Sequence, residues 1–167
     1  MGNINSCLRN GKLSFGDDFK KVVEVTRLFG LAATKLPFHS CFNIPNEKDS
    51  IAWLVTEDGG LDKKTNGQWH NIRTFGPESD EHGWNEILTI SEFNDAAETT
   101  LSRIENELAK PRTRYVFWRE SRLGVRWYKF YGVFEIDAEA TRNTLSGDCP
   151  RVVYQCVSKN VACLKTA

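Results

Sequence analysis

The sequence lacks several features that would place the protein outside the cell, in a membrane or around a cofactor. Its 167 residues include five cysteines, an odd number that is typical of free thiols in a reducing compartment. No apolar run is long enough to cross a bilayer. Neither a P-loop nor a dinucleotide-binding fingerprint occurs. We therefore expect a cytoplasmic protein with no membrane partner and no cofactor.

The sequence contains one short pattern that would direct the protein to a membrane. The chain starts with MGNINS, which fits the N-myristoylation pattern, and Cys7 follows as a site for palmitate. A single acyl chain holds a protein at a membrane only weakly. The sequence leaves open whether this signal is functional.

Catalytic and metal-binding patterns are missing as well. The three histidines show no zinc spacing, and no nucleophile is paired with a base at a recognisable spacing. We expect no catalytic residues and no metal ligands, and a binding protein is favoured over an enzyme. The enzyme alternative would need a metal, and its candidate ligands are Asp58, Asp62 and His70.

Size and charge indicate one domain without a general attraction to nucleic acid. The 22 basic and 22 acidic residues balance, so that any nucleic-acid site must come from a local patch. Residues 1–16 are polar and contain glycine, which predicts a flexible N-terminal arm. We expect residues 17–167 to form a single domain.

Periodicity predicts segregated helices and strands. The expected helices are 17–30, 92–110 and a short one from Asp137, and the expected strands are 38–44, 50–57, 68–75, 83–90, 113–120, 125–136 and 151–158. This order argues for an α+β fold. We expect a curved, mainly antiparallel sheet or a small open β-barrel with two to three flanking helices.

The hairpin at 114–137 carries a resemblance to a known superfamily. It reads RYVFWRE, a turn, and VRWYKFYGVFEID, and a short helix and RVVYQCVS follow it. Residues 114–159 resemble the C-terminal half of PUA-like barrel domains, which include the SRA, EVE, ASCH and YTH domains. In these domains the second strand ends in a pattern like Gly132-Val133-Phe134-Glu135. The resemblance implies a pocket for a modified or flipped base, RNA or a small nucleotide, and a link to modification-dependent restriction.

Alternation along the second hairpin strand separates two faces. Tyr128, Phe130 and Phe134 lie on the more apolar face, which we expect to meet the core. Trp127 and Tyr131 lie on the other face, beside Lys129 and among several arginines. Aromatic rings next to cations suit base stacking and phosphate contact. The alternative is that the helix at 92–110 packs on this second face.

The remaining candidate site residues come from the other tryptophans and from the basic hairpin. Trp69 is the best pocket candidate because it lies near glycine turns, and Asn71 could read a base edge through its amide. The full set of predicted ligand-binding residues is Trp53, Trp69, Asn71, Trp118, Trp127 and Tyr131. The predicted phosphate-binding residues are Arg119, Arg126 and Lys129.

These observations favour a module that binds nucleic acid or a modified base and that belongs to restriction or phage defence. Its partner would be DNA, RNA or a nucleotide. Two alternatives stay open, a protein that binds or sequesters free or cyclic nucleotides, and a protein–protein interaction domain. The sequence does not decide between a monomer and a homodimer.

Overall fold

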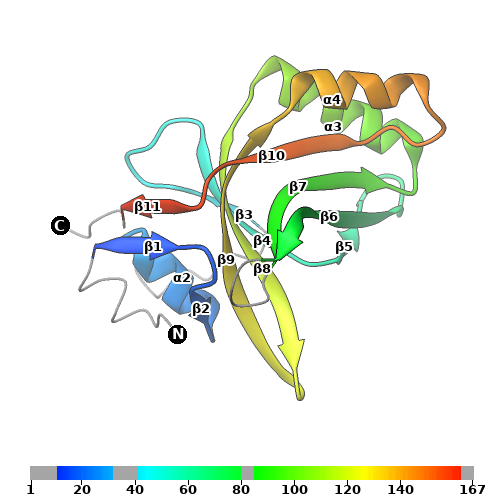
Figure 1. The fold of residues 1–167 in the computed structure, drawn as a ribbon. Coiled ribbons are helices and arrows are strands. Elements are labelled where there is room, and N and C mark those ends of the chain that lie inside the picture. The colour runs from blue at the N-terminus through cyan, green and yellow to red at the C-terminus, as the bar shows by residue number, and fades with distance from the viewer. Residues whose placement is uncertain (1–10, 32–40, 80–84, 163–167) are drawn as a thin grey trace. The chain divides into compact units, whose positions relative to one another are not determined.

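The computed structural model describes residues 11–31, 41–79 and 85–162, and the chain divides into two compact units. Unit 1 consists of Met1–Thr56, Thr113–Phe134 and Val157–Ala167. Unit 2 consists of Glu57–Arg112 and Glu135–Cys156. Each unit is described by itself (Figure 1). The single domain expected over 17–167 stays a prediction.

Unit 1 is built on a mixed sheet. Its strands follow the order β3 (Cys41–Asn43), β4 (Ser50–Val55), β8 (Thr113–Arg122) and β9 (Val125–Ile136), and β2 (Asp18–Phe19) pairs with β9. Strands β4 and β8 run parallel, and the other pairs run antiparallel. Helix α2 (Val22–Leu28) follows β2. The parallel pair places two segments side by side that are far apart in the sequence.

The described part of the expected N-terminal arm is a strand. Lys12–Ser14 form β1, which pairs antiparallel with β11 (Asn160–Ala162). Leu13 is only 1% exposed and belongs to the core of unit 1. Burial of Leu13 stabilises this segment as a strand. The flexible arm predicted for 1–16 therefore extends too far along the chain. Residues 1–10 lie outside the described residues.

The core of unit 1 is an aromatic cluster around Phe117. The Phe117 ring lies 6.0 Å from Phe19, 6.0 Å from Phe29 and 5.2 Å from Phe130, measured between ring centroids. Edge-to-face and tilted contacts of this kind add to the gain from burial alone. Strands β8 and β9 therefore supply the central part of the core as well as the predicted hairpin.

A β-bulge changes which hairpin residues face this core. Val116 is opposite Gly132 and Phe117 is opposite Phe130, so that Tyr131 is an extra residue in β9. Gly132 has a φ of 117°, a conformation that side chains disfavour. Beyond the bulge Val133 belongs to the core cluster of unit 1, and Phe134 is fully buried outside that cluster. The strict alternation predicted for this strand is therefore wrong after Tyr131.

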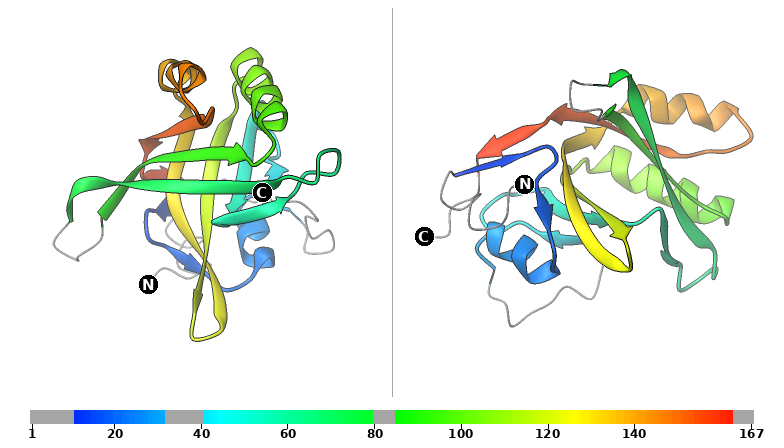
Figure 2. Two further views of the ribbon diagram at one scale, coloured as in Figure 1. Left: turned by 90° about the vertical axis from the view of Figure 1, so that its right-hand side faces the viewer. Right: turned by 60° about the horizontal axis from the view of Figure 1, so that its bottom comes forward.

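Unit 2 contains an antiparallel sheet with helices (Figure 2). Its strand order is β10 (Val152–Ser158), β7 (Asn85–Asn94), β6 (Gln68–Ser79) and β5 (Asp58–Leu61). Helix α3 (Ala97–Ala109) packs against β7. Helix α4 (Ala138–Asn143) leads into the 3₁₀ turn η1 (Thr144–Ser146). Asp137 caps α4 by accepting a hydrogen bond from the Ala140 amide, as its position in the sequence predicted.

The fold class is confirmed, and several element boundaries are corrected, among them the helix expected at 17–30, which is strand β2 followed by helix α2. The described residues form an α+β protein with a mostly antiparallel, mixed sheet, three α-helices and no closed barrel. Strand β7 continues to Asn94, so that α3 begins at Ala97 rather than at 92. The segment from Asp58, which reads as a turn, is strand β5. Among the described helices none is long and apolar enough to span a membrane.

Tyr115 provides a test of the packing in unit 1. Its hydroxyl donates to Glu47 Oε1 at 3.0 Å, and burial together with the Glu47 charge raises the pKa of Tyr115 to about 12. The folded protein thus favours the neutral phenol, and this contribution to stability is present below pH ~10 and lost as the pH rises toward 12. We expect Tyr115→Phe to lower the free energy of unfolding at pH 8 by about 1–2 kcal/mol.

Urea unfolding at a series of pH values between 8 and ~11 measures this effect. The wild type should lose stability more steeply with pH than Tyr115→Phe. The pKa of Tyr128 is also raised by burial, and its contribution remains in both proteins. Parallel pH profiles for the two proteins would contradict the assignment.

Candidate functional site

Polar side chains meet on one face of the sheet of unit 2. Trp69 and Asn71 are two residues apart on β6, so that they share a face. On the neighbouring strand Asn94 lies opposite Trp69, and Glu92 lies opposite Asn71. Asn71 is 5% exposed and Glu92 is 6% exposed. An amide and a carboxylate thus stand side by side in a buried position.

The Glu92 carboxylate has two polar partners. The Arg103 guanidinium on α3 donates from Nη1 to Glu92 Oε1 at 3.1 Å. The Tyr154 hydroxyl on β10 donates to the same oxygen at 3.4 Å. A buried carboxylate without partners would cost several kcal/mol, and these bonds offset that cost. Both bonds converge on Oε1.

Arg103 lies over the Trp69 ring, and a glycine on the neighbouring strand leaves room beside it. The Arg103 guanidinium lies 4.5 Å from the centre of the Trp69 ring, a cation–π contact. A Cβ atom added to Gly59 on β5 would come within 2.9 Å of Trp69 Cβ and 3.8 Å of Asn71 Nδ2. The absence of a side chain at Gly59 therefore lets β5 approach the two predicted site residues on β6.

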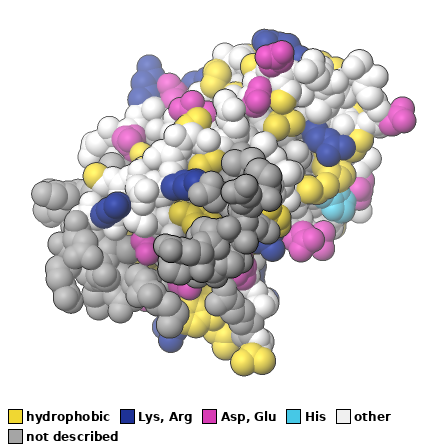
Figure 3. Space-filling model, in the orientation of Figure 1, with side chains coloured by type: hydrophobic (Ala, Val, Ile, Leu, Met, Phe, Trp, Pro, Cys, Tyr) yellow, Lys and Arg dark blue, Asp and Glu magenta, His cyan; other side chains and the backbone are white. Residues whose placement is uncertain are grey.

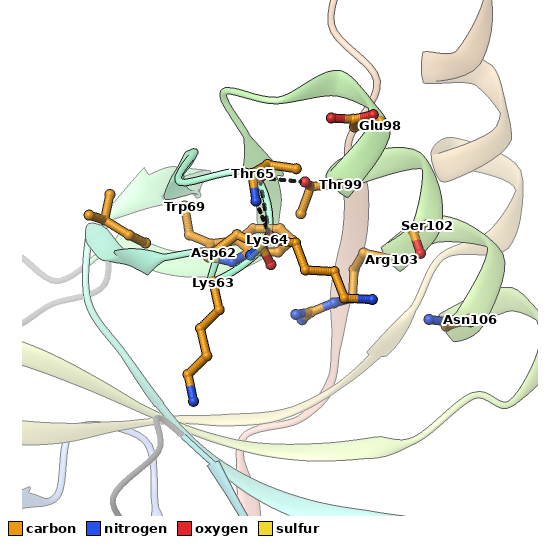
Figure 4. Close-up of a pocket in the computed structure, with 11 residues that line it drawn as sticks. Asp62, Lys63, Lys64, Thr65, Trp69, Glu98, Thr99, Ser102, Arg103 and Asn106 are labelled. Atoms are coloured by element: carbon orange, nitrogen blue, oxygen red, sulfur yellow. Dashed lines mark hydrogen bonds between the residues drawn. The ribbon is translucent and has the colours of Figure 1, made fainter.

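A groove opens beside Trp69 (Figure 4). Its volume is about 800 Å³, and its walls are the loop at 61–65 and the first three turns of α3. The loop and the helix are joined by a hydrogen bond of 2.9 Å between the hydroxyls of Thr65 and Thr99. This volume lies within the range of small-ligand sites.

Asp62 stabilises the loop that forms one wall of the groove. Its Oδ2 accepts hydrogen bonds from the amides of Lys64 and Thr65 and from the Thr65 hydroxyl. The backbone hydrogen bond from Thr65 is the main reason why the pKa of Asp62 is lowered. This carboxylate therefore stabilises the loop.

His70 lies between two other aspartates. Its Nε2 is 2.8 Å from Asp95 Oδ1 and its Nδ1 is 3.5 Å from Asp58 Oδ1. The ring also stacks on Phe93 at 5.1 Å. Within residues 11–31, 41–79 and 85–162, no group of three such side chains could hold a metal ion.

In unit 1 the structure brings two predicted stacking residues together, in the interior. Trp118 and Tyr131 are each 2% exposed, and their rings stack at 5.6 Å. Tyr131 also lies 5.8 Å from the Phe15 ring and donates its hydroxyl to Glu120 Oε1 at 2.7 Å. These contacts are typical of a core, because each polar tip finds a partner and each ring lies on another ring.

The remaining predicted residues of unit 1 differ in their exposure. Trp53 is buried under the Arg114 guanidinium, which lies 4.7 Å from its ring. Trp127 is half-buried, with Lys20 Nζ 5.1 Å from its ring. Arg126 is exposed, and Arg119 and Lys129 are half-buried. On the face shown in Figure 3, outside the grey atoms, Lys and Arg side chains are scattered among other types.

The family follows from comparison with known proteins. The model of the SRA (SET and RING associated) domain matches residues 6–163. The chain belongs to the SRA family. The predicted PUA-like resemblance is confirmed, and because SRA domains bind modified cytosine in DNA, so is the prediction of a modified-base-binding module.

A solved structure has a similar fold. It is that of the 5-hydroxymethylcytosine-specific restriction enzyme AbaSI, with a TM-score of 0.66 and 22% sequence identity. The match covers 96% of this SRA chain and 45% of the AbaSI chain, so that this chain spans less than half the length of that enzyme. No curated protein matches the sequence.

Sequence reasoning found Trp69 and Asn71 but missed their neighbours in the SRA domain. Glu92 was assigned to the start of a helix, although it lies in strand β7. Arg103 and Tyr154 are too far from Asn71 in the sequence to be linked by spacing. No local signal placed Glu92 in a strand, because apolar and polar residues do not alternate from Ile90 to Asn94.

The approach of β5 to Trp69 yields a prediction with a matched control. Gly59→Ala should lower the free energy of unfolding by about 1–3 kcal/mol, because the new methyl group overlaps Trp69 Cβ. Gly60→Ala, one residue along the same strand, meets no atom within 4 Å and should be neutral or stabilising by up to ~1 kcal/mol. Urea unfolding followed by tryptophan fluorescence compares the two variants. Equal stabilities would show that Gly59 is not needed for close approach.

Proposed function

We propose that this SRA domain reads a modified cytosine of DNA through Asn71 and Glu92. The observation that carries the proposal is the pairing of a buried amide with a buried carboxylate at opposite register positions on β6 and β7. The position of each group is set by the sheet, and Glu92 is further held by Arg103 and Tyr154. A site of this kind can distinguish bases by hydrogen bonding.

The chemistry of cytosine matches these two groups. Cytosine offers an amino group at N4 as a donor, which a carboxylate accepts. Its ring nitrogen N3 and carbonyl O2 are acceptors, to which the NH₂ of an asparagine can donate. Thymine and uracil have a carbonyl in place of the amino group and would face the Glu92 carboxylate with a second acceptor. The pair thus favours cytosine over the other pyrimidines.

The buried position of the pair supports recognition of an extruded base. Inside a duplex the Watson–Crick edge of cytosine is occupied by guanine, so that the pair can reach it only after the base has left the stack. Trp69, on the same face of β6, would contact the extruded base with the part of its ring that Arg103 leaves open. Unit 1, taken by itself, offers Arg119, Arg126 and Lys129 for contacts with phosphates and Trp127 for stacking.

The similarity in fold to AbaSI suggests the first modified base to test. That enzyme is specific for 5-hydroxymethylcytosine, and we infer the same class of ligand here, a cytosine with a substituent at C5. We further propose that the module works within a restriction system, where reading of a modified base directs cleavage.

Binding experiments with three matched duplexes test the proposal. Fluorescence anisotropy would compare duplexes that carry 5-hydroxymethylcytosine, 5-methylcytosine or unmodified cytosine at one position, at fixed salt. The wild type should prefer a modified duplex. Glu92→Gln and Asn71→Ala should each reduce that preference by roughly 10- to 100-fold, which corresponds to ~1–3 kcal/mol per lost base contact.

Two exposed residues of the same types provide controls. Glu105→Gln on α3 and Asn143→Ala on α4 change the same chemistry at exposed positions and should retain the preference. Circular dichroism would check that each variant is folded. Equal binding of all three duplexes by the folded wild type would rule out the proposal, and unchanged preference in Glu92→Gln would rule out the role of Glu92.

A further inference from the structure

We infer that the groove between the loop at 61–67 and helix α3 holds a backbone phosphate of the DNA strand that carries the extruded base. The inference rests on the proposed function and adds a second contact site in unit 2. The sequence did not predict this groove. All phosphate contacts predicted from the sequence lie on the hairpin of unit 1.

Hydrogen-bond donors converge in the groove. In Figure 4 the ammonium of Lys64 and the guanidinium of Arg103 extend into the same space, and Ser102 and Asn106 line the helical side. The Arg103 charge is compensated in part by Glu92, whereas the Lys64 ammonium is exposed and adds a second positive charge at the groove. A phosphate would take donors from all four side chains.

The acidic residues of the groove do not cancel this arrangement. Asp62 Oδ2 is turned into its own loop, where it accepts from Lys64 and Thr65. Glu98 lies at the other end of the lining, one helical turn before Ser102 (Figure 4). The end of the groove near Arg103 is therefore the basic end.

The two walls are fixed to each other, so that the donors are positioned before a ligand arrives. Besides the Thr65–Thr99 bond, Asn94 Nδ2 donates to the Gly67 carbonyl at 3.0 Å, and Asn94 Oδ1 accepts from the Ala96 amide at 2.9 Å. A Cβ atom on Gly67 would overlap Asn94 Oδ1. Asn94 thus connects the loop with the start of α3, and preorganisation of this kind lowers the entropic cost of binding.

The groove is continuous with the proposed base site through two residues. Trp69 and Arg103 line the groove, while Trp69 shares its face of β6 with Asn71 and Arg103 bonds to Glu92. A base that leaves the duplex remains attached to its sugar and flanking phosphates. When the base lies against Asn71 and Glu92, a flanking phosphate is therefore brought to the groove.

Salt dependence of DNA binding tests the groove with a matched pair of lysines. Lys64→Ala should reduce the slope of log affinity against log salt by about 0.9 on the duplex with the modified base, because one phosphate contact is lost. Lys110→Ala is the control, since Lys110 is exposed at the C-terminal end of α3, outside the lining of the groove, and its removal should change the slope less. An unchanged slope in Lys64→Ala, or an equal decrease in both variants, would overturn the inference.

A second pair of variants leaves the lysines in place. Ser102 is exposed on α3, and Ser102→Glu would add a negative charge to the groove, whereas Ser102→Gln would add similar bulk without charge. We expect Ser102→Glu to bind DNA roughly fivefold more weakly than Ser102→Gln at low salt. Equal affinities would count against a phosphate at this place.

The design separates failure of the groove from failure of the proposed function. The slopes are measured on each duplex by itself, so that the groove is judged even if the wild type shows no preference for a modified base. Free 5-hydroxymethylcytidine monophosphate provides a further comparison. If it binds as tightly as the duplex and Lys64→Ala weakens its binding, the groove holds the phosphate of a nucleotide, and its assignment to a DNA strand is wrong.

Discussion

The buried carboxylate of Glu92 is the constraint on which the site in unit 2 depends. A charge at 6% exposure must have partners, and it obtains them from α3 through Arg103 and from β10 through Tyr154. These bonds fix α3 on this face of the sheet. Removal of Glu92 alone would leave the Arg103 guanidinium and the Tyr154 hydroxyl without this acceptor, so that the carboxylate also contributes to the packing of α3 on the sheet.

Arg103 connects three features that the sequence presents separately. It compensates the charge of Glu92, covers part of the Trp69 ring and lines the groove of unit 2. Its planar guanidinium can do all three because it donates in fixed directions and stacks on an aromatic ring, which a lysine ammonium cannot. The proposed base and phosphate contacts therefore share one residue, and a ligand at either place would affect the other.

The sequence predicted the fold class, most elements and the family from patterns that are local. The hairpin at 114–137 and the N-cap Asp137 are examples, because turn chemistry and strand composition are read from neighbouring residues. The role of Tyr131 could not be read in this way. A bulge at that residue changes the facing of β9, and only the pairing of Val116 with Gly132 reveals it.

Only the part of the candidate site that is local in the sequence was predicted. Trp69 and Asn71 are two residues apart and stood out together, whereas Glu92, Arg103 and Tyr154 reach them through strand pairing and helix packing. For the aromatic residues of the hairpin, the sequence did not show which of them are buried. Trp118 and Tyr131 suited base stacking by composition, yet in the structure their rings stack on each other in the interior. Composition identifies aromatic residues but not which of them remain accessible.

The most direct test of the account is a double-mutant cycle between Glu92 and the amino group of the modified base. Affinities would be measured for the wild type and Glu92→Gln, each with a duplex that carries the modified cytosine and with one whose base lacks the 4-amino group. If the carboxylate accepts from that amino group, the two changes are coupled by about 1–3 kcal/mol. Additive effects would mean that Glu92 does not contact the base and that the assignment of the reading site is wrong.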